Sequence, residues 1–385
     1  MSYSKISQQW QEQADLAERK KRGQYMTPQA VRERLLALVE LRPGMKVLDP
    51  GVGTGEFLRS ALDMAPEIDA YGWDLDDNIL PYAQQLVPEA TLLQRDALTP
   101  SAERFDLVIG NPPYFQVSDP ELRRRFSVVV SGRANIFALF FKAGMDLLNP
   151  GGQLAYVVPP SMNNGRYFQA LRQWLCQQGE IEQLQILTES NLFEQATTAA
   201  QLIVIRKGQP GTAYTFSRQE LLLFSPDPKA LAASFSGRAT LWELGYRART
   251  GTVVWNQAKD RLSQEHSAGA IRLIWSRDLS SEDFLDRPLK WIQEQAAEEQ
   301  GVILVNRIVG QVGRGQLRVR LAPQFPYCAE NHVNVIVRRN DVEQLVSPER
   351  LLELLSSDAV VERLRLVTGN TQISATELTH LLPLG

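Results

Sequence analysis

The segment VLDPGVGTGEFL (residues 47–58) decides the fold, because it has the pattern of a buried strand, a glycine-rich turn and the start of a helix. Such a turn lets a ligand approach the backbone and presents free N–H groups at the helix amino terminus. The dinucleotide-binding pattern G-x-G-x-x-G needs a third glycine where this chain has Glu56. A Walker loop is excluded, because no Gly-Lys-Ser/Thr follows. Asp49, just before the turn, would repel a pyrophosphate and suits a cationic ligand.

Acidic residues after this turn favour S-adenosylmethionine as the ligand. This methyl donor carries a sulfonium and an α-amino group, and a neighbouring carboxylate attracts both. Asp74 ends the next strand, ~20 residues beyond the turn, where an acid can accept the ribose hydroxyls. Asp96 ends the third strand, where it can accept the adenine amino group. Single strand-end acids are common in α/β proteins, but three of them beside a glycine-rich turn indicate a ligand site at that edge of the sheet.

The rest of the first half alternates strands and helices, which predicts a parallel α/β sheet wound right-handed. Strands are expected at residues 45–50, 68–76, 91–98, 105–113, 152–160, 181–189 and 199–208. One helix is expected over 31–42, with Thr27 as its cap and Pro28 at its first position, and another over 135–152. The last two strands have a short connection without a helix, which predicts an antiparallel hairpin at the sheet edge.

The pattern changes after about residue 210, where prolines and short apolar runs mixed with Arg, Asn, Gln and Thr replace the regular alternation. We therefore expect two domains, a cofactor-binding and catalytic domain over 1–212 and a mixed α/β domain over 213–385. The fold class is α/β, with a Rossmann-like seven-stranded sheet in the first domain.

The stretch FDLVIGNPPYF (105–115) places an amide, two prolines and two aromatic rings at the end of a buried strand. Prolines have no N–H, so the kink presents only acceptors, namely the Asn111 side-chain oxygen and the Pro112 carbonyl. Two convergent acceptors suit a planar –NH2 group, and they can stabilise the positive charge that develops on an adenine amine during attack on a methyl group. Tyr114 offers a flat face on which a base can stack, worth ~1–3 kcal/mol.

NPPY preceded by an apolar strand, with DPGVGTGEF upstream, resembles the motifs of the amino-methyltransferases. The chain resembles one branch of these enzymes over nearly its whole length. That branch is the DNA adenine-N6 methyltransferases of the gamma order, typical of bacterial type II restriction–modification systems. The segment RGQYMTPQAVRERLL (22–36) resembles their amino-terminal cofactor motif, and NLFEQATTAAQLIVIRK (191–207) resembles the loop that carries a stacking aromatic. The resemblance implies S-adenosylmethionine as cofactor, a flipped adenine in double-stranded DNA as substrate, and a carboxy-terminal target-recognition domain.

Candidate site residues combine both lines of reasoning. The catalytic candidates are Asn111, Pro112, Tyr114 and, by the resemblance, Phe193 against the other face of the base. The cofactor candidates are Thr27, Pro28, Asp49, Gly51, Gly53, Gly55, Phe57, Asp74, Leu75, Asp96, Ala97, Asn111 and Pro113. Many relatives have an aromatic where this chain has Ala97, so Pro113 or Phe57 is expected to pack against the adenine of the cofactor. The DNA-binding candidates, whose side chains suit guanine, adenine or phosphate, are Arg123, Arg249, Thr250, Asn256, Lys259, Arg307, Arg314, Arg318 and His332.

Plainer interpretations stand beside these roles. Phe57, Phe137 and Phe193 can each be ordinary core residues, although Phe137 lies where relatives touch the cofactor. Arg123 belongs to a run of three arginines that can be a solvated helix end or a phosphate clamp. NPPY also occurs in methyltransferases that act on ribosomal RNA or protein glutamine, and a catalytically inactive DNA-binding protein is a third interpretation.

The composition is that of an ordinary globular protein, with 385 residues, 22% of them charged and a net charge of −3. A DNA partner must therefore be met by a local basic surface. Two cysteines, three histidines without ligand spacing and no apolar leader indicate a reducing cytoplasm and no metal. The resemblance further implies a monomer on DNA and a separate restriction endonuclease acting on the same site.

Overall fold

The computed structural model describes residues 3–132, 135–187, 200–307, 316–367 and 372–385. The chain divides into two compact units, Met1–Pro228 and Lys229–Gly385. The division lies after the expected boundary at 212, because the hairpin of β8 (Thr215–Arg218) and β9 (Leu221–Phe224) belongs to the first unit. The buried Arg172 of the first unit ties the hairpin down by donating to the Leu222 carbonyl at 2.6 Å.

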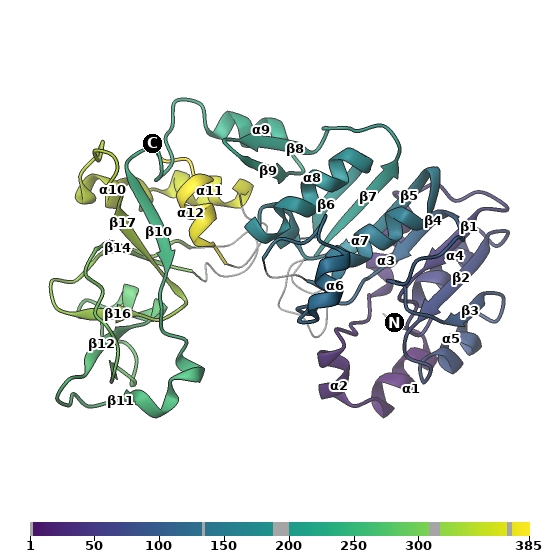
Figure 1. The fold of residues 1–385 in the computed structure, drawn as a ribbon, viewed down its shortest axis with the longest axis horizontal. Coiled ribbons are helices and arrows are strands. Elements are labelled where there is room, and N and C mark those ends of the chain that lie inside the picture. The colour runs from purple at the N-terminus through teal and green to yellow at the C-terminus, as the bar shows by residue number, and fades with distance from the viewer. Residues whose placement is uncertain (1–2, 133–134, 188–199, 308–315, 368–371) are drawn as a thin grey trace. The chain divides into compact units, whose positions relative to one another are not determined.

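The first unit is built on a seven-stranded sheet in the order β3-β2-β1-β4-β5-β7-β6 (Figure 1). Its strands are β1 (Lys46–Asp49), β2 (Asp69–Asp74), β3 (Thr91–Gln94), β4 (Phe105–Gly110), β5 (Leu148–Val158), β6 (Gly179–Leu187) and β7 (Ala200–Lys207). The strands from β3 to β5 pair in parallel, whereas β7 runs antiparallel to both of its neighbours. The parallel α/β sheet and the antiparallel hairpin at its edge are therefore confirmed.

Helices cover both faces of this sheet, because successive strand residues point to opposite sides. Val108 of β4 packs with α7 (Ile136–Leu147) and α8 (Gln169–Gln178) in one core cluster. Its neighbours Leu107 and Ile109 pack with α3 (Gln29–Leu36) and α4 (Glu56–Met64) in the other. The helices of the first unit are α1 (Lys5–Gln13), α2 (Leu16–Lys21), α3 (Gln29–Leu36), α4 (Glu56–Met64), α5 (Leu80–Leu86), α6 (Pro120–Arg125), α7 (Ile136–Leu147) and α8 (Gln169–Gln178).

Several predicted elements were too long. The helix expected over 135–152 ends at Leu147 as α7, because β5 begins at Leu148. Helix α3 ends at Leu36, not at residue 42, because Leu38, Val39 and Leu41 pack against the core outside the helix. Its cap is Pro28 and makes no side-chain bond, so the expected Thr27 cap is wrong. Strand β3 ends at Gln94, since the backbone then turns toward Asp96 and Leu98 donates to the Asp96 carboxylate at 2.9 Å.

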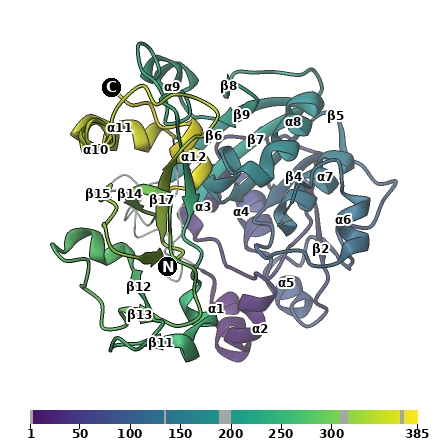
Figure 2. The same ribbon diagram turned by 60° about the vertical axis from the view of Figure 1, so that its left-hand side comes forward.

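The second unit contains two four-stranded sheets and a group of helices (Figure 2). One sheet has the order β10-β17-β14-β15 and the other β11-β13-β12-β16. The strands are β10 (Tyr246–Thr250), β11 (Leu262–Ser263), β12 (Ile271–Ile274), β13 (Trp291–Ile292), β14 (Gly301–Asn306), β15 (Val319–Leu321), β16 (Tyr327–Ala329) and β17 (Val333–Arg338). The helices are α9 (Pro228–Ser234), α10 (Pro348–Leu355), α11 (Asp358–Val367) and α12 (Ala375–His380). Helices α10 to α12 pack on one face of the first sheet, whose other face packs against β12 and β16.

Among the described residues, no helix combines the length and the apolar composition needed to cross a membrane.

Candidate active site

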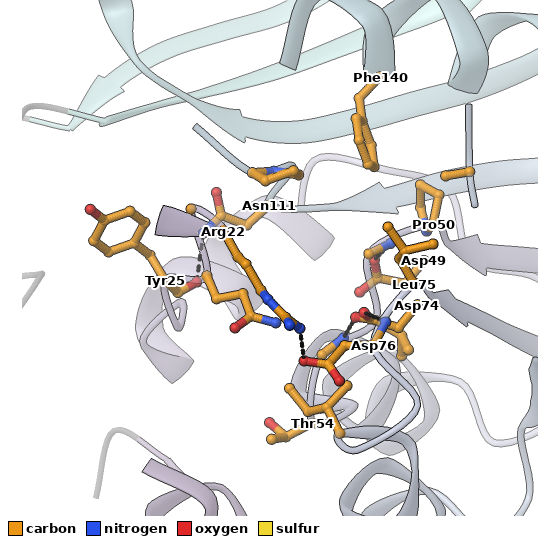
Figure 3. A pocket seen from close by; sticks show the side chains of 18 of the residues that line it. Arg22, Tyr25, Asp49, Pro50, Thr54, Asp74, Leu75, Asp76, Asn111 and Phe140 are labelled. Atoms are coloured by element: carbon orange, nitrogen blue, oxygen red, sulfur yellow. Dashed lines mark hydrogen bonds and ion pairs between the residues drawn. The ribbon is translucent and has the colours of Figure 1, made fainter. Parts of the chain in front are cut away.

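A cavity of about 640 Å³ opens at the carboxyl ends of the parallel strands of the first unit, a size typical of small-molecule sites. Figure 3 shows Asp49 and Asp74 on one side of it and Asn111 on the other. This is the edge at which open α/β sheets bind their ligands. Its lining includes Thr27, Asp49, Gly51, Gly53, Phe57, Asp74, Leu75, Asp96, Ala97, Asn111 and Pro113.

The glycine-rich turn adopts a backbone that other residues would disfavour. Gly53 and Gly55 have φ angles of +54° and +90°, in the left-handed region. Gly55 does not line the cavity but caps α4 there, and a Cβ on it would lie 2.9 Å from Val87. Gly55 forms the turn, and its predicted contact with the cofactor stays a prediction. Pro28 likewise lies outside the lining, because it caps α3.

The buried Asp49 and the half-buried Asp74 fix the backbone of this turn by accepting hydrogen bonds from its amides. Asp49 accepts from the Gly51 amide at 3.1 Å, and Asp74 accepts from the Gly53 amide at 2.9 Å and from the Asp76 amide at 2.9 Å. Gly110 makes room for Asp49, because a Cβ there would lie 2.8 Å from the Asp49 carboxylate. The glycine that precedes Asn111 is thus required by the acid of the neighbouring strand.

Burial gives the cavity wall an unusual electrostatic character. Desolvation raises the pKa of Asp49 to about 7, a rise that the Gly51 hydrogen bond opposes and the charge of Asp74 reinforces. Desolvation also raises the pKa of Asp74, against the hydrogen bonds from Asp76 and Gly53. A cationic ligand beside these two acids would stabilise their ionised forms, which burial disfavours.

Asn111 lies at the cavity rim with its amide oriented by the backbone. Its Nδ2 donates to the Tyr25 carbonyl at 3.1 Å. The Tyr114 hydroxyl is hydrogen-bonded to Asn111 Oδ1 and lies 2.7 Å from the Val157 carbonyl. Burial raises the pKa of this hydroxyl, so Tyr114 stays a donor. The Asn111 oxygen therefore accepts from Tyr114 and keeps one further lone pair.

The structure describes two of the other three catalytic candidates, Tyr114 and Pro112. Tyr114 is half-buried, with its ring 6.1 Å from Phe137 in the core and 6.3 Å from the nearly parallel ring of Tyr25. Pro112 is buried and does not line the cavity, so its role as the second acceptor stays a prediction. Phe193 lies outside the described residues, so its stacking role stays a prediction.

Several residues of the cavity were missed in the sequence analysis. Phe140 of α7 lines the cavity, one turn after the candidate Phe137, which is 1% exposed in the core. The four-residue spacing from Ile136, which also lines the cavity, could have located this face of α7. The other missed residues are Trp10, Arg22, Gly23, Gln24, Tyr25, Met26, Pro50, Val52, Thr54, Glu56, Asp76, Asp77, Asn78, Ile79, Arg95, Leu98 and Phe115.

Most of these missed residues come from the amino-terminal segment and the loop after β2. The Ser4 amide donates to Glu56 at 2.8 Å, and the Ser7 and Thr54 hydroxyls lie 2.7 Å apart. These bonds hold α1 against the start of α4. Sequence offered little signal for this docking, because α1 is polar and has only two buried residues, Ser7 and Trp10.

The DNA-binding candidates fall into two groups. Exposed side chains are those of Arg123, Asn256, Lys259 and Arg318. The side chains of the second group contact other residues of the protein. Arg249 pairs with the buried Glu298 carboxylate, and His332 pairs with Glu330. Thr250 is hydrogen-bonded to Asn334, and Arg307 donates to the Asn331 carbonyl. Arg314 lies outside the described residues. Arg123 also donates to the Gly132 carbonyl at 2.7 Å, at the end of α6.

The seven-stranded order with one reversed strand, and the acids facing a glycine-rich turn, define a class I S-adenosylmethionine-dependent methyltransferase fold. Residues 71–193 match the family model of the Eco57I restriction-modification methylase, and residues 11–85 match that of the N-6 DNA methylase. These matches confirm the resemblance to N6-adenine DNA methyltransferases of restriction–modification systems. Assignment to the gamma order stays a prediction.

Individual relatives are distant. The chain is 25% identical over 221 residues to modification methylase CviBIII of Paramecium bursaria Chlorella virus NC1A, covering 56% of this chain and 57% of that one. It is 26% identical to the type II methyltransferase M.CvrRI of Paramecium bursaria Chlorella virus XZ-6E, covering 67% and 68%. The match to M.AccI of Acinetobacter calcoaceticus, at 25% identity, covers 52% of this chain and 39% of that protein. A solved structure described as a class I S-adenosylmethionine-dependent methyltransferase from Listeria monocytogenes is 25% identical with a TM-score of 0.45, covering 54% and 70%.

Proposed function

We propose that this protein transfers a methyl group from S-adenosylmethionine to the N6 amino group of an adenine that is flipped out of duplex DNA. The observation that carries the proposal is the Asn111 amide at the cavity rim, whose nitrogen donates to the Tyr25 carbonyl. Its oxygen accepts the Tyr114 hydroxyl with one lone pair and has a second lone pair for another donor. The matches to DNA methylases support the DNA substrate.

The residues of the cavity fit the methyl donor. Asp49 suits its cationic methionine part, and Asp74, at the end of β2, suits its ribose hydroxyls. Asp96, Ala97 and Pro113 lie in the same lining and form the proposed adenine side. When bound, the donor supplies an electrophilic methyl group on a positively charged sulfur.

The protein's own contribution to the reaction is positioning and charge stabilisation. The amine of the target adenine has its lone pair delocalised into the ring, and it becomes positively charged as it attacks the methyl group. The Asn111 oxygen and the Pro112 carbonyl are proposed to accept its two hydrogens and to stabilise that charge. Tyr114, with Phe193 on the opposite face, is proposed to stack on the base, which offsets part of the few kcal/mol that flipping costs.

DNA contacts are proposed for both units. Arg123 near the catalytic loop suits a phosphate, and the exposed Asn256, Lys259 and Arg318 are the accessible candidates of the second unit, which we propose to be the target-recognition domain. In this proposal the enzyme works in the cytoplasm as a monomer and protects its site from a separate restriction endonuclease.

The substrate class is tested by transfer of a radiolabelled methyl group from S-adenosylmethionine. We expect label in unmethylated double-stranded genomic DNA, recovered as N6-methyladenine after digestion, and none in ribosomal RNA or in release-factor protein. A labelled RNA base or glutamine side chain instead would move the enzyme to one of the other NPPY classes. Unlabelled DNA, RNA and protein together would indicate an inactive DNA-binding protein.

Replacing Tyr114 by alanine is expected to weaken flipping, because the loss of one stacking face removes ~1–3 kcal/mol. Fluorescence of 2-aminopurine placed at the target position measures this directly, since its emission rises when the base leaves the stack. The matched control is Tyr167→Ala, which removes a tyrosine that is 42% exposed. Flipping is excluded if wild-type protein binds this DNA without any rise in emission.

A further inference from the structure

The residues just before the cofactor motif, Arg22 to Tyr25, lie directly on the catalytic loop, and we name them the arm. Gly23 has a φ angle of +65°, and a Cβ built on it would lie 2.6 Å from the backbone nitrogen of Tyr114. Real Cβ atoms essentially never come that close to a backbone atom. Glycine at position 23 is thus what allows this contact between the two segments.

The arm fixes the nitrogen end of the Asn111 amide, while the Tyr114 hydroxyl donates to its oxygen end. An asparagine side chain has a donor end and an acceptor end. The Tyr25 carbonyl, which cannot donate, accepts from Nδ2 at 3.1 Å (Figure 3). Reversing the amide would place two acceptors against each other, so this contact keeps Oδ1 as the acceptor.

The other end of the arm is fixed across the cavity. Arg22 pairs with Asp76 at 2.5 Å, and Figure 3 shows its side chain reaching from beside Asn111 to Asp76. Burial works to raise the pKa of Asp76, but hydrogen bonds from Asn78 and the charge of Arg22 lower it overall, so Asp76 stays ionised. The arm therefore runs from the loop after β2, on the proposed ribose side, to the catalytic asparagine.

We propose that the arm is a positioning device for Asn111, in which Gly23 permits the close approach and the Tyr25 carbonyl holds the catalytic amide with its oxygen toward the reacting amine. This role rests on the proposed methyl transfer. Tyr25 and Gly23 act through Asn111, so they are positioning residues and not catalytic ones.

The first test replaces Gly23 by alanine, with Gly44→Ala as the matched control. Both glycines have left-handed backbones, but nothing lies within 4 Å of a Cβ at Gly44. With cofactor and DNA saturating, we expect Gly23→Ala to lower the single-turnover rate by at least ~10-fold, because a misplacement of 1 Å can cost ~10²-fold. The control is expected to stay within ~3-fold of wild type. The proposal is overturned if the rate at saturation is unchanged, since the arm would then affect only cofactor affinity.

The second test replaces Asn111 by aspartate, which keeps the shape and an acceptor oxygen. The carboxylate cannot donate to the Tyr25 carbonyl, but the protonated acid can. We expect the rate of the variant relative to wild type to rise as pH falls, by ~10-fold per pH unit above the pKa of the new carboxyl. If charge alone mattered, the carboxylate would favour the positive amine and the ratio would rise with pH, which would overturn the proposal. Dividing by the wild-type rate removes the pH dependence that both proteins share from the other ionisable groups near Asn111. These groups are Arg22, Tyr25, Asp49, Glu56, Asp74, Asp76, Asp77, Arg95, Asp96 and Tyr114.

A third measurement does not depend on activity. In protein with ¹⁵N-labelled asparagine, the Asn111 side-chain amide is assigned by its loss in Asn111→Ala. We expect the one hydrogen that Nδ2 donates to the Tyr25 carbonyl to exchange with water more slowly in the free wild-type protein than in Gly23→Ala. Fast exchange in wild type that does methylate DNA would overturn the arm proposal alone. Slow exchange in a wild-type protein that methylates nothing would overturn the proposed function and leave the arm contact standing.

Discussion

Alanine in place of Asn111 is expected to lower the rate of methyl transfer by about 10²–10³-fold, while the affinity for S-adenosylmethionine stays nearly unchanged. The physical reason is that Asn111 Oδ1 is proposed as one of two acceptors that stabilise a charge present only in the transition state. Removing such an interaction lowers the rate of the chemical step and leaves ground-state binding unchanged. Asn111 also lies at the rim of the cavity, away from the acids that suit the cationic part of the cofactor.

Single-turnover kinetics on duplex DNA measure the rate, and calorimetry measures cofactor binding. Asn149→Ala is the matched control, because Asn149 donates to Asp106 at the amino end of β4, the opposite end of the same strand. Activity that survives within tenfold in Asn111→Ala would mean that the paired-acceptor mechanism is wrong.

Asparagine in place of Asp49 is expected to weaken cofactor binding and to stabilise the free protein, so the two effects have opposite signs. The binding loss follows from removing a buried negative charge beside the proposed cationic ligand. The stability gain follows from burial, which raises the pKa of Asp49 to about 7, against ~3.9 in an unfolded chain. Folding therefore favours the protonated acid. The contribution of protonated Asp49 to the free energy of unfolding is fully present below pH ~3.9 and is lost as pH rises through about 7.

Thermal unfolding of the ligand-free protein checks the sign. The difference in melting temperature between Asp49→Asn and wild type is expected to be small near pH 4 and largest at pH 7 and above. Titration with S-adenosylmethionine should show wild-type affinity rising between pH 6 and 8, and a weak affinity without this rise in the variant. Asp69→Asn serves as control, because Asp69 is exposed at the start of β2. Equal cofactor affinity of wild type and Asp49→Asn at pH 8 would rule out the proposed role of Asp49.

Local sequence was sufficient where one residue type has one physical role. Glycines 53 and 55 predict a left-handed turn, and the structure has positive φ angles at both. The apolar run of β4 is buried on both faces, as a parallel strand requires. The acids Asp49, Asp74 and Asp96 were placed together from strand order alone, because parallel strands bring their carboxyl ends to one edge, and all three line the cavity.

Other features depend on contacts between residues distant in sequence. Phe137 and Phe140 are both apolar residues of one helix, and only the packing of α7 decides that Phe140 faces the cavity while Phe137 faces the core. Arg249 was an expected DNA contact on its chemistry, but the fold places it against the buried Glu298. A lone arginine in a sequence carries no signal of a partner some fifty residues away.

The sequence by itself determined the sheet, the glycine-rich turn and the position of Asn111 directly after β4, because backbone stereochemistry and strand periodicity act over a few residues. Tertiary structure alone decided the pKa of Asp49, the contact of Tyr25 with Asn111 and the close approach of Gly23 to Tyr114. These features arise from burial and from backbone atoms brought together across some ninety residues, and side-chain patterns along the chain do not encode such distances.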